Sequence, residues 1–225
     1  LQDGGVLACA KHFPGHGDSD SDSHLTLPSI LHVTERLDSM ELAPFRTLTD
    51  AGVGAMMAAH LYIPALDSTP GLPSTLSPRI IDTLLRQKIG FQGLVFTDAM
   101  TMKGFASFAT TATPHVDALL AGNDILLFPG HPLTVLTELE KAVSEGRIDS
   151  LFIAAKCKRV LQAKSWCRVD ETPSGYGFSP DAERNHRAIL SSSITAVKNK
   201  GNALPFGSHV HSLSSLFIGW KKSPE

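Results

Sequence analysis

A polar segment near the start of the chain carries most of the side chains that could do chemistry. Residues 11–28 read KHFPGHGDSDSDSHLTLP and include three histidines, three aspartates and a lysine. Pro14, Gly15 and Gly17 break regular structure, so we expect these groups to lie on a loop that is neither helix nor strand. Loops held by a rigid scaffold are where catalytic and binding groups concentrate. The segment is therefore the first candidate for a functional site.

Two interpretations of this segment involve no catalysis. It could be a solvated turn whose aspartates accept hydrogen bonds from backbone amides. It could also hold a metal, because the aspartates within residues 18–22 have the opening spacing of a calcium loop. Ser23 and Ser29 stand where that loop needs glycine and glutamate, however, and a Pro-Gly pair between His12 and His16 prevents the helix that would align them. We expect no metal and no other cofactor.

In the third interpretation the segment supplies a general acid and base. Asp22 and His24 are two residues apart, close enough for the carboxylate to orient the imidazole. A carboxylate bonded to one ring nitrogen fixes the histidine tautomer and favours the imidazolium, which suits proton transfer near neutral pH. Such a pair needs a nucleophile, and Asp98 follows an apolar run that is typical of a strand.

The elements that would position these groups alternate along the chain. Apolar runs predict strands at 6–10, 53–59, 94–97 and 125–128, separated by helical patterns at 34–50, from Ser77-Pro78 to Gly90, and at 115–121, 132–145 and 149–164. This alternation predicts βα units and a parallel sheet. Lys11, His12, His60 and Asp98 all fall at carboxyl ends of these strands. A (β/α)8 barrel keeps catalytic residues there, and an open doubly wound sheet binds ligands there.

Composition excludes several other classes of protein. The 225 residues are 42% apolar and 19% charged, with a net charge of −2, so nothing indicates a nucleic-acid partner. No apolar run approaches the ~20 residues of a transmembrane helix. Cys9, Cys157 and Cys167 are too few, and odd in number, for a disulfide framework.

Several segments together resemble one enzyme family, the β-N-acetylglucosaminidase branch of glycoside hydrolase family 3. They are KHFPGHG at 11–17 with DSH at 22–24, AAHLYIPALD at 58–67, GLVFTDAMTMKG at 93–104, AGNDILL at 121–127, and SITAVKN at 193–199 with GNALP at 201–205. The first motif is long and specific. The others extend the resemblance through nearly the whole chain.

The resemblance implies a (β/α)8 TIM-type barrel that performs retaining hydrolysis of an amino-sugar glycoside. By matching position, Asp98 would be the nucleophile. His24 would be the acid/base, with Asp22 as its dyad partner. Lys11 and His12 would hydrogen-bond the sugar. We also expect His60 to line the substrate site, although a lone histidine that ends an apolar strand is often a satisfied core residue.

The same family includes other activities. Histidine, unlike a carboxylate, does not repel an anionic acceptor, so phosphate could replace water and make the enzyme a phosphorylase. Other branches are β-glucosidases with a glutamate acid elsewhere, and the intact Asp22-Ser23-His24 argues against that assignment. A non-catalytic sugar-binding remnant is a further alternative. The resemblance is compatible with cytoplasmic, periplasmic or secreted proteins.

We expect three segments along the chain. Residues 1–168 would be the C-terminal half of the catalytic barrel, 169–192 a linker and helix, and 193–225 the truncated start of an α/β-sandwich domain with strands at 193–198 and 213–219. The chain begins Leu1-Gln2-Asp3, without methionine. We therefore expect it to be part of a longer protein, inactive by itself.

Overall fold

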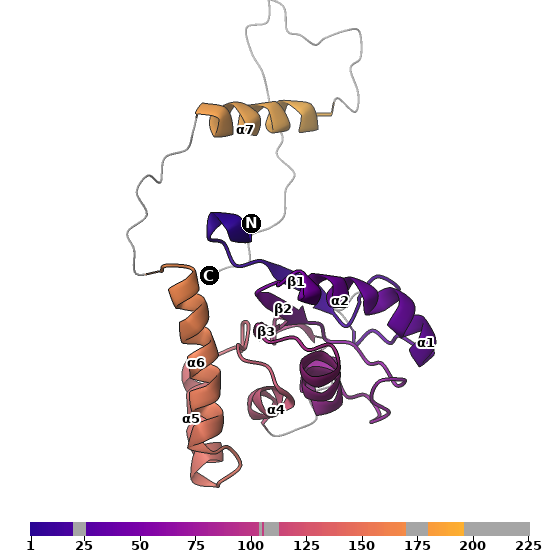
Figure 1. The fold of residues 1–225 in the computed structure, drawn as a ribbon, viewed down its shortest axis with the longest axis vertical. Helices are drawn as coiled ribbons and strands as arrows, with labels where there is room; N and C mark the ends of the chain where they lie inside the picture. Colours follow the sequence, from indigo (N-terminus) through magenta and orange to yellow (C-terminus); the bar gives the residue numbers. More distant parts are fainter. Residues whose placement is uncertain (20–25, 104, 106–112, 170–179, 196–225) are drawn as a thin grey trace, which may run out of the picture. The chain divides into compact units, whose positions relative to one another are not determined.

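The computed structural model describes residues 1–19, 26–103, 105, 113–169 and 180–195 (Figure 1). The chain forms two compact units, Leu1–Thr172 and Pro173–Glu225. Within the second unit, the described part is the helix α7 (Pro180–Ser193) and the two residues that follow it. The strand expected at 213–219 lies outside the described residues. The strand expected at 193–198 does not begin where it was predicted, because Ser193 ends α7 and residues 194 and 195 have no regular structure, while 196–198 lie outside the described residues. The three expected segment boundaries stay predictions.

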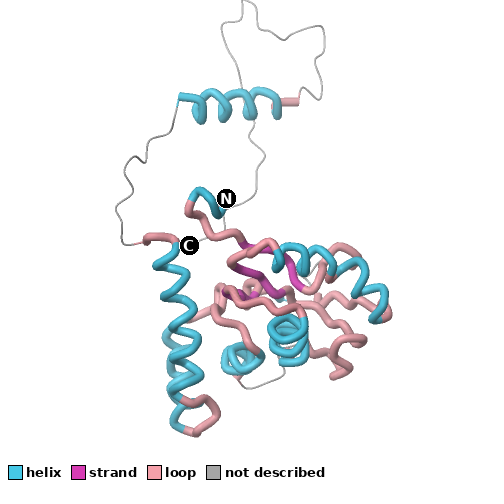
Figure 2. The backbone as a smooth tube through the Cα atoms, in the orientation of Figure 1, coloured by secondary structure: helices cyan, strands magenta, loops and turns pink. Residues whose placement is uncertain are grey.

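The first unit is built on a parallel sheet in the order β1-β2-β3, with β1 at Cys9–Phe13, β2 at Ala55–Ala58 and β3 at Leu94–Thr97 (Figure 2). The expected strand at 94–97 is confirmed at both ends. The strand expected at 125–128 is present only as a parallel bridge between Ile125 and Phe96. It stops there because the Leu127 N–H donates to the hydroxyl of Thr97 (2.9 Å) instead of continuing the backbone ladder.

The start of β1 corrects one expectation. The predicted strand covered residues 6–10, whereas β1 runs from Cys9 to Phe13 and so takes in Lys11 and His12. These residues are strand and not loop, because the Phe13 carbonyl accepts a hydrogen bond from the Ala59 N–H (2.8 Å) and the Phe13 side chain is fully buried. The polar segment leaves the sheet only after Phe13.

The expected helices appear in their predicted order, together with two short helices, η1 and η3, that the sequence did not predict. Their bounds are η1 Gln2–Gly4, α1 Thr34–Arg36, η2 Leu37–Glu41, α2 Ala43–Asp50, η3 Ser74–Leu76, η4 Arg79–Lys88, α4 Pro114–Ala121, α5 Pro132–Ser144 and α6 Ser150–Trp166. The Ser77 hydroxyl accepts from the Ile80 N–H (3.2 Å) at the start of η4, and Asp149 caps α6 through the Phe152 N–H (2.6 Å). Both capping residues begin the helices that the sequence predicts.

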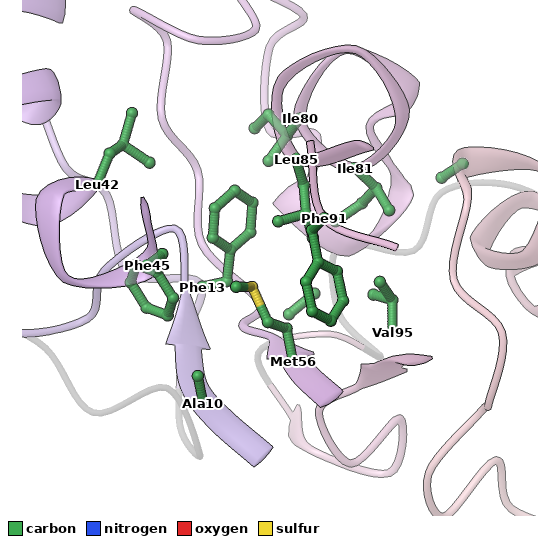
Figure 3. Close-up of a cluster of buried hydrophobic side chains, with 12 residues drawn as sticks. Ala10, Phe13, Leu42, Phe45, Met56, Ile80, Ile81, Leu85, Phe91 and Val95 are labelled. Carbon is green, nitrogen blue, oxygen red and sulfur yellow. The ribbon is translucent and has the colours of Figure 1, made fainter. Parts of the chain in front are cut away.

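One apolar cluster joins the sheet to the helices that cover it (Figure 3). It contains Phe13 from β1, Met56 from β2 and Val95 from β3, packed against Phe45 of α2 and the apolar side of η4. The rings of Phe13 and Phe45 meet edge to face, with centroids 5.2 Å apart. Burial of these side chains fixes one face of each strand toward the helices, which aims the polar groups that follow each strand at a common edge.

Candidate active site

The carboxyl ends of three neighbouring strands bring three of the expected site residues together. His12 lies on β1, His60 follows β2 by two residues, and Asp98 comes directly after β3. The backbone N–H of Asp98 donates to the Ala58 carbonyl (2.8 Å), so the end of β3 is tied to the end of β2. This is the edge at which parallel α/β folds hold ligands and catalytic groups.

His12 and Asp98 face each other across the end of β2. The His12 Nε2 lies 3.9 Å from Asp98 Oδ2, and the two side chains are 31% and 16% exposed. The other carboxylate oxygen, Oδ1, accepts a hydrogen bond from the Ala99 N–H (2.8 Å). The carboxylate therefore has one oxygen held by the backbone and the other turned toward an imidazole that solvent can reach.

His60 lies close to Asp98, in contact with the carbonyl of Ala99, and is fully buried. Its Nδ1 is 2.8 Å from the hydroxyl of Thr75, and its Nε2 is 3.2 Å from the carbonyl oxygen of Ala99. Burial lowers the pKa of His60 to about 4, although the negative charge of Asp98 acts in the opposite direction. His60 is therefore neutral at ordinary pH. The sugar contact expected of it stays a prediction, and its present partners are protein groups.

Lys11 is exposed on β1, next to His12. Its positive charge partly offsets the effect of burial on the neighbouring Cys9 thiol, whose pKa is raised. Asp22 and His24, the expected acid/base dyad, lie outside the described residues, so their roles stay predictions.

Described residues on either side of the dyad segment form a charged network. Asp18, which precedes the segment, lies 2.6 Å from His32 Nε2 and 3.7 Å from an Arg36 nitrogen. Arg36 also pairs with the Glu41 carboxylate at 2.6 and 2.8 Å. Gly15 fits closely against Glu41, because a Cβ at that position would lie 2.7 Å from the Glu41 Cβ. Gly15 and Asp18, which precede Asp22 and His24 in the chain, are thus held against residues 32–41, which follow them.

A second polar cluster was not expected from sequence. The buried carboxylate of Asp124 accepts from Arg86 (2.5 Å), Arg159 (2.8 Å) and the Val95 N–H of β3 (3.0 Å), and it lies 3.7 Å from the amine of Lys156. Burial lowers the pKa of Lys156 to about 8, again against the pull of Asp124. In the sequence, this cluster was indicated only by the AGND motif at 121–124 and by the three-residue spacing of Lys156 and Arg159 on α6.

The described residues include no group of three or more His, Cys, Asp or Glu side chains that could hold a metal ion. Among the same residues, no helix is both long and apolar enough to cross a membrane. Two surface cavities lie away from the carboxyl ends of the strands. One is lined by Gly54, Gly93 and Arg159, and the other by Leu119 and Leu161. The candidate site is therefore defined by its side chains and not by either cavity.

Comparison with known proteins identifies the family. The profile of the glycosyl hydrolase family 3 N terminal domain matches residues 1–163. The chain belongs to glycoside hydrolase family 3. The expected α/β fold of the TIM-barrel type is confirmed by this match and by the parallel sheet, and the family expected from sequence is confirmed with it.

Curated relatives of this family 3 chain are β-hexosaminidases. That of Chromobacterium violaceum is 40% identical over 129 residues, covering 57% of this chain and 35% of the relative. β-Hexosaminidase A of Pseudoalteromonas piscicida is 29% identical over 220 residues, covering 88% and 37%.

Solved structures of other enzymes are also similar to this chain. A family 3 β-N-acetylglucosaminidase from Paenibacillus sp. FPU-7 superimposes with a TM-score of 0.75 and 37% identity, covering 89% of this chain and 40% of that one. The β-glucoside phosphorylase BglX has the same TM-score at 24% identity, a likeness of fold. The chain thus spans well under half the length of the relatives that it matches.

Proposed function

We propose that this chain supplies the catalytic groups of a retaining exo-β-N-acetylglucosaminidase that removes terminal β-linked N-acetylhexosamine. The observation that carries the proposal is the Asp98 carboxylate at the end of β3, with Oδ2 3.9 Å from His12 and Oδ1 held by a backbone N–H. The likeness to β-hexosaminidases and to a β-N-acetylglucosaminidase supports the choice of an amino-sugar substrate.

In the first step Asp98 attacks the anomeric carbon. A bond forms between that carbon and a carboxylate oxygen, while the bond to the leaving-group oxygen breaks. His24 donates its proton to the leaving oxygen, and Asp22 stabilises the imidazolium before the transfer. The product of this step is a glycosyl ester of Asp98 together with a free alcohol.

In the second step water attacks the same carbon from the face that the leaving group vacated. His24, now neutral, takes the proton of the water, and the ester bond breaks to return the Asp98 carboxylate. Two inversions give net retention. Lys11 and His12 donate hydrogen bonds to sugar hydroxyls near the anomeric centre. We place the reaction in the turnover of peptidoglycan or of other amino-sugar glycosides.

The chain alone is expected to be inactive. It spans 35 to 40% of the length of the relatives compared above, so most of their length has no counterpart in these 225 residues. The functional test therefore uses the complete gene product that carries this sequence.

The test compares an aryl β-N-acetylglucosaminide with the matching aryl β-glucoside, and adds azide to two variants. Asp98→Ala with azide should give the α-glycosyl azide, since azide then attacks the substrate directly. His24→Ala with azide should give the β-azide, because azide attacks the glycosyl ester. Asp50→Ala and His186→Ala, both exposed and both outside the motifs, serve as matched controls and should behave as wild type.

Other outcomes would change the assignment. Sugar 1-phosphate that appears only with added phosphate would make the protein a phosphorylase. A preference for glucoside that survives His24→Ala would indicate a β-glucosidase with a different acid. No turnover of either glycoside by the wild type would favour a non-catalytic sugar-binding remnant.

A further inference from the structure

The hydrogen bonds of His60 determine its tautomer. The Ala99 carbonyl can only accept, so His60 Nε2 carries the proton of the 3.2 Å contact. In the neutral ring Nδ1 is then an acceptor, and the Thr75 hydroxyl donates to it at 2.8 Å. Both ring nitrogens therefore have a protein partner. The side chain is fully buried, so no edge of the ring faces the solvent.

The partner of Nε2 is the residue that holds the expected nucleophile. Ala99 is restrained on both sides, since its N–H donates to Asp98 Oδ1 (2.8 Å) and its carbonyl accepts from His60. The ring of Phe105 packs against that of His60 with centroids 4.4 Å apart and an angle of 34° between the ring planes, which limits rotation of the imidazole. The position of the Asp98 carboxylate therefore depends on His60 through one intervening residue.

The restraint continues away from the site through buried groups. The carbonyl of Thr75 accepts from the Asn123 side-chain amide (2.8 Å), and the carbonyl of Asn123 accepts from the Lys156 amine (2.6 Å). Thr75 and Asn123 are completely buried. Hydrogen bonds thus connect His60 to Thr75 of η3 and, through Asn123, to Lys156 of α6. Both helices are packed elements of the fold.

We propose that His60 is a positioning residue that holds the Asp98 carboxylate in its reactive orientation through the carbonyl of Ala99, and that it does not bind the sugar. The inference rests on the proposed role of Asp98. It replaces the direct sugar contact that the sequence predicted with an indirect role that the buried geometry favours.

The test is a pair of variants that each keep one of the two hydrogen bonds. His60→Gln places an amide nitrogen near the position of Nε2 and can still donate to Ala99. His60→Asn reaches only the position of Nδ1 and keeps the contact with Thr75. In the complete gene product, assayed on the aryl β-N-acetylglucosaminide, His60→Asn should lower kcat about 100-fold, the cost of a misplaced reacting group. His60→Gln should recover most of that loss, and both variants should keep KM within about threefold of wild type.

Amide hydrogen exchange supplies a readout that does not need turnover. Exchange of the segment with Ala99 and Met100 should accelerate in His60→Asn and stay near the wild-type rate in His60→Gln. If His60→Asn is too unstable to study, Thr75→Val and Thr75→Ser form a second pair. The serine variant keeps the hydroxyl, so it should match wild type while Thr75→Val loosens the same segment.

Three results would overturn the proposal. They are equal losses of kcat in the two His60 variants, a rise in KM that exceeds the fall in kcat, and unchanged exchange around Ala99 in His60→Asn. If the wild type turns over neither glycoside, it is the proposed function that fails. The exchange measurement then decides by itself whether His60 restrains Ala99.

Discussion

Nε2 of His12 and Oδ2 of Asp98 lie 3.9 Å apart although β2 separates their strands. Strands that flank a third one are roughly 10 Å apart in a sheet, since neighbours are spaced by about 4.8 Å. The two side chains therefore converge over the end of β2. Groups that are 86 positions apart in the chain become one site by this convergence.

His12→Ala should lower kcat/KM on the aryl β-N-acetylglucosaminide by roughly 3- to 10-fold, the value of a hydrogen bond to a neutral sugar hydroxyl. The physical reason is the loss of a donor beside the Asp98 carboxylate and the sugar. His16→Ala is the matched control, because its Nδ1 contacts Ser19 (3.0 Å) and its ring centroid is 6.1 Å from that of His12. Steady-state kinetics of the complete gene product check this, and an equal loss in both variants would contradict it.

The pKa of His60 predicts a loss of stability in acid. The folded-state pKa is about 4 and the ordinary value is 6.5, so between these pH values the unfolded chain binds a proton that the folded one does not. Stability is fully present above pH 6.5 and is lost as the pH falls toward 4, by on the order of 3 kcal/mol. Urea unfolding of wild type and His60→Gln across this range measures it. The variant should show the shallower dependence, and identical slopes would refute the assignment.

The two members of the Asp124–Lys156 contact should respond differently to substitution. Asp124→Asn leaves Arg86, Arg159 and Lys156 without their shared carboxylate and should cost about 3–5 kcal/mol. Lys156→Met removes a cation whose pKa burial has already lowered, and Asp124 keeps both arginines. The buried Asn123 carbonyl loses its 2.6 Å donor, so that variant should cost about 1–3 kcal/mol, less than Asp124→Asn. Chemical denaturation checks both values, and a larger loss in Lys156→Met would contradict this account.

Gly15 and Gly17 form a matched pair in the polar segment. Gly15 has a φ of +131°, and an added Cβ would lie 2.7 Å from the Cβ of Glu41, whereas a Cβ at Gly17 would have no neighbour within 4 Å. Gly15→Ala should destabilise the protein by about 1–3 kcal/mol through backbone strain and this clash. Gly17→Ala should be nearly neutral. Thermal and urea unfolding distinguish them, and equal effects would show that the close approach is unimportant.

The strand and helix pattern was largely predictable from sequence because it depends on local signals. The apolar run at 94–97 and the start signal Ser77-Pro78 predicted elements that the structure confirms. The start of β1 was misplaced, because Pro14 and Gly15 have the local character of a loop. Only the packing of Phe13 and its bond to Ala59 extend the strand through Lys11 and His12.

The residue types that could do chemistry, and the family to which they belong, were determined by the sequence itself, since a motif such as KHFPGHG is a property of neighbouring residues. The tertiary structure alone decided that His12 meets Asp98 over β2, that His60 turns to Ala99 and Thr75, and that Asp124 gathers three cations. These relationships depend on strand register and on burial between distant segments. No local pattern encodes them, because the partners become neighbours only when the sheet and its helices pack.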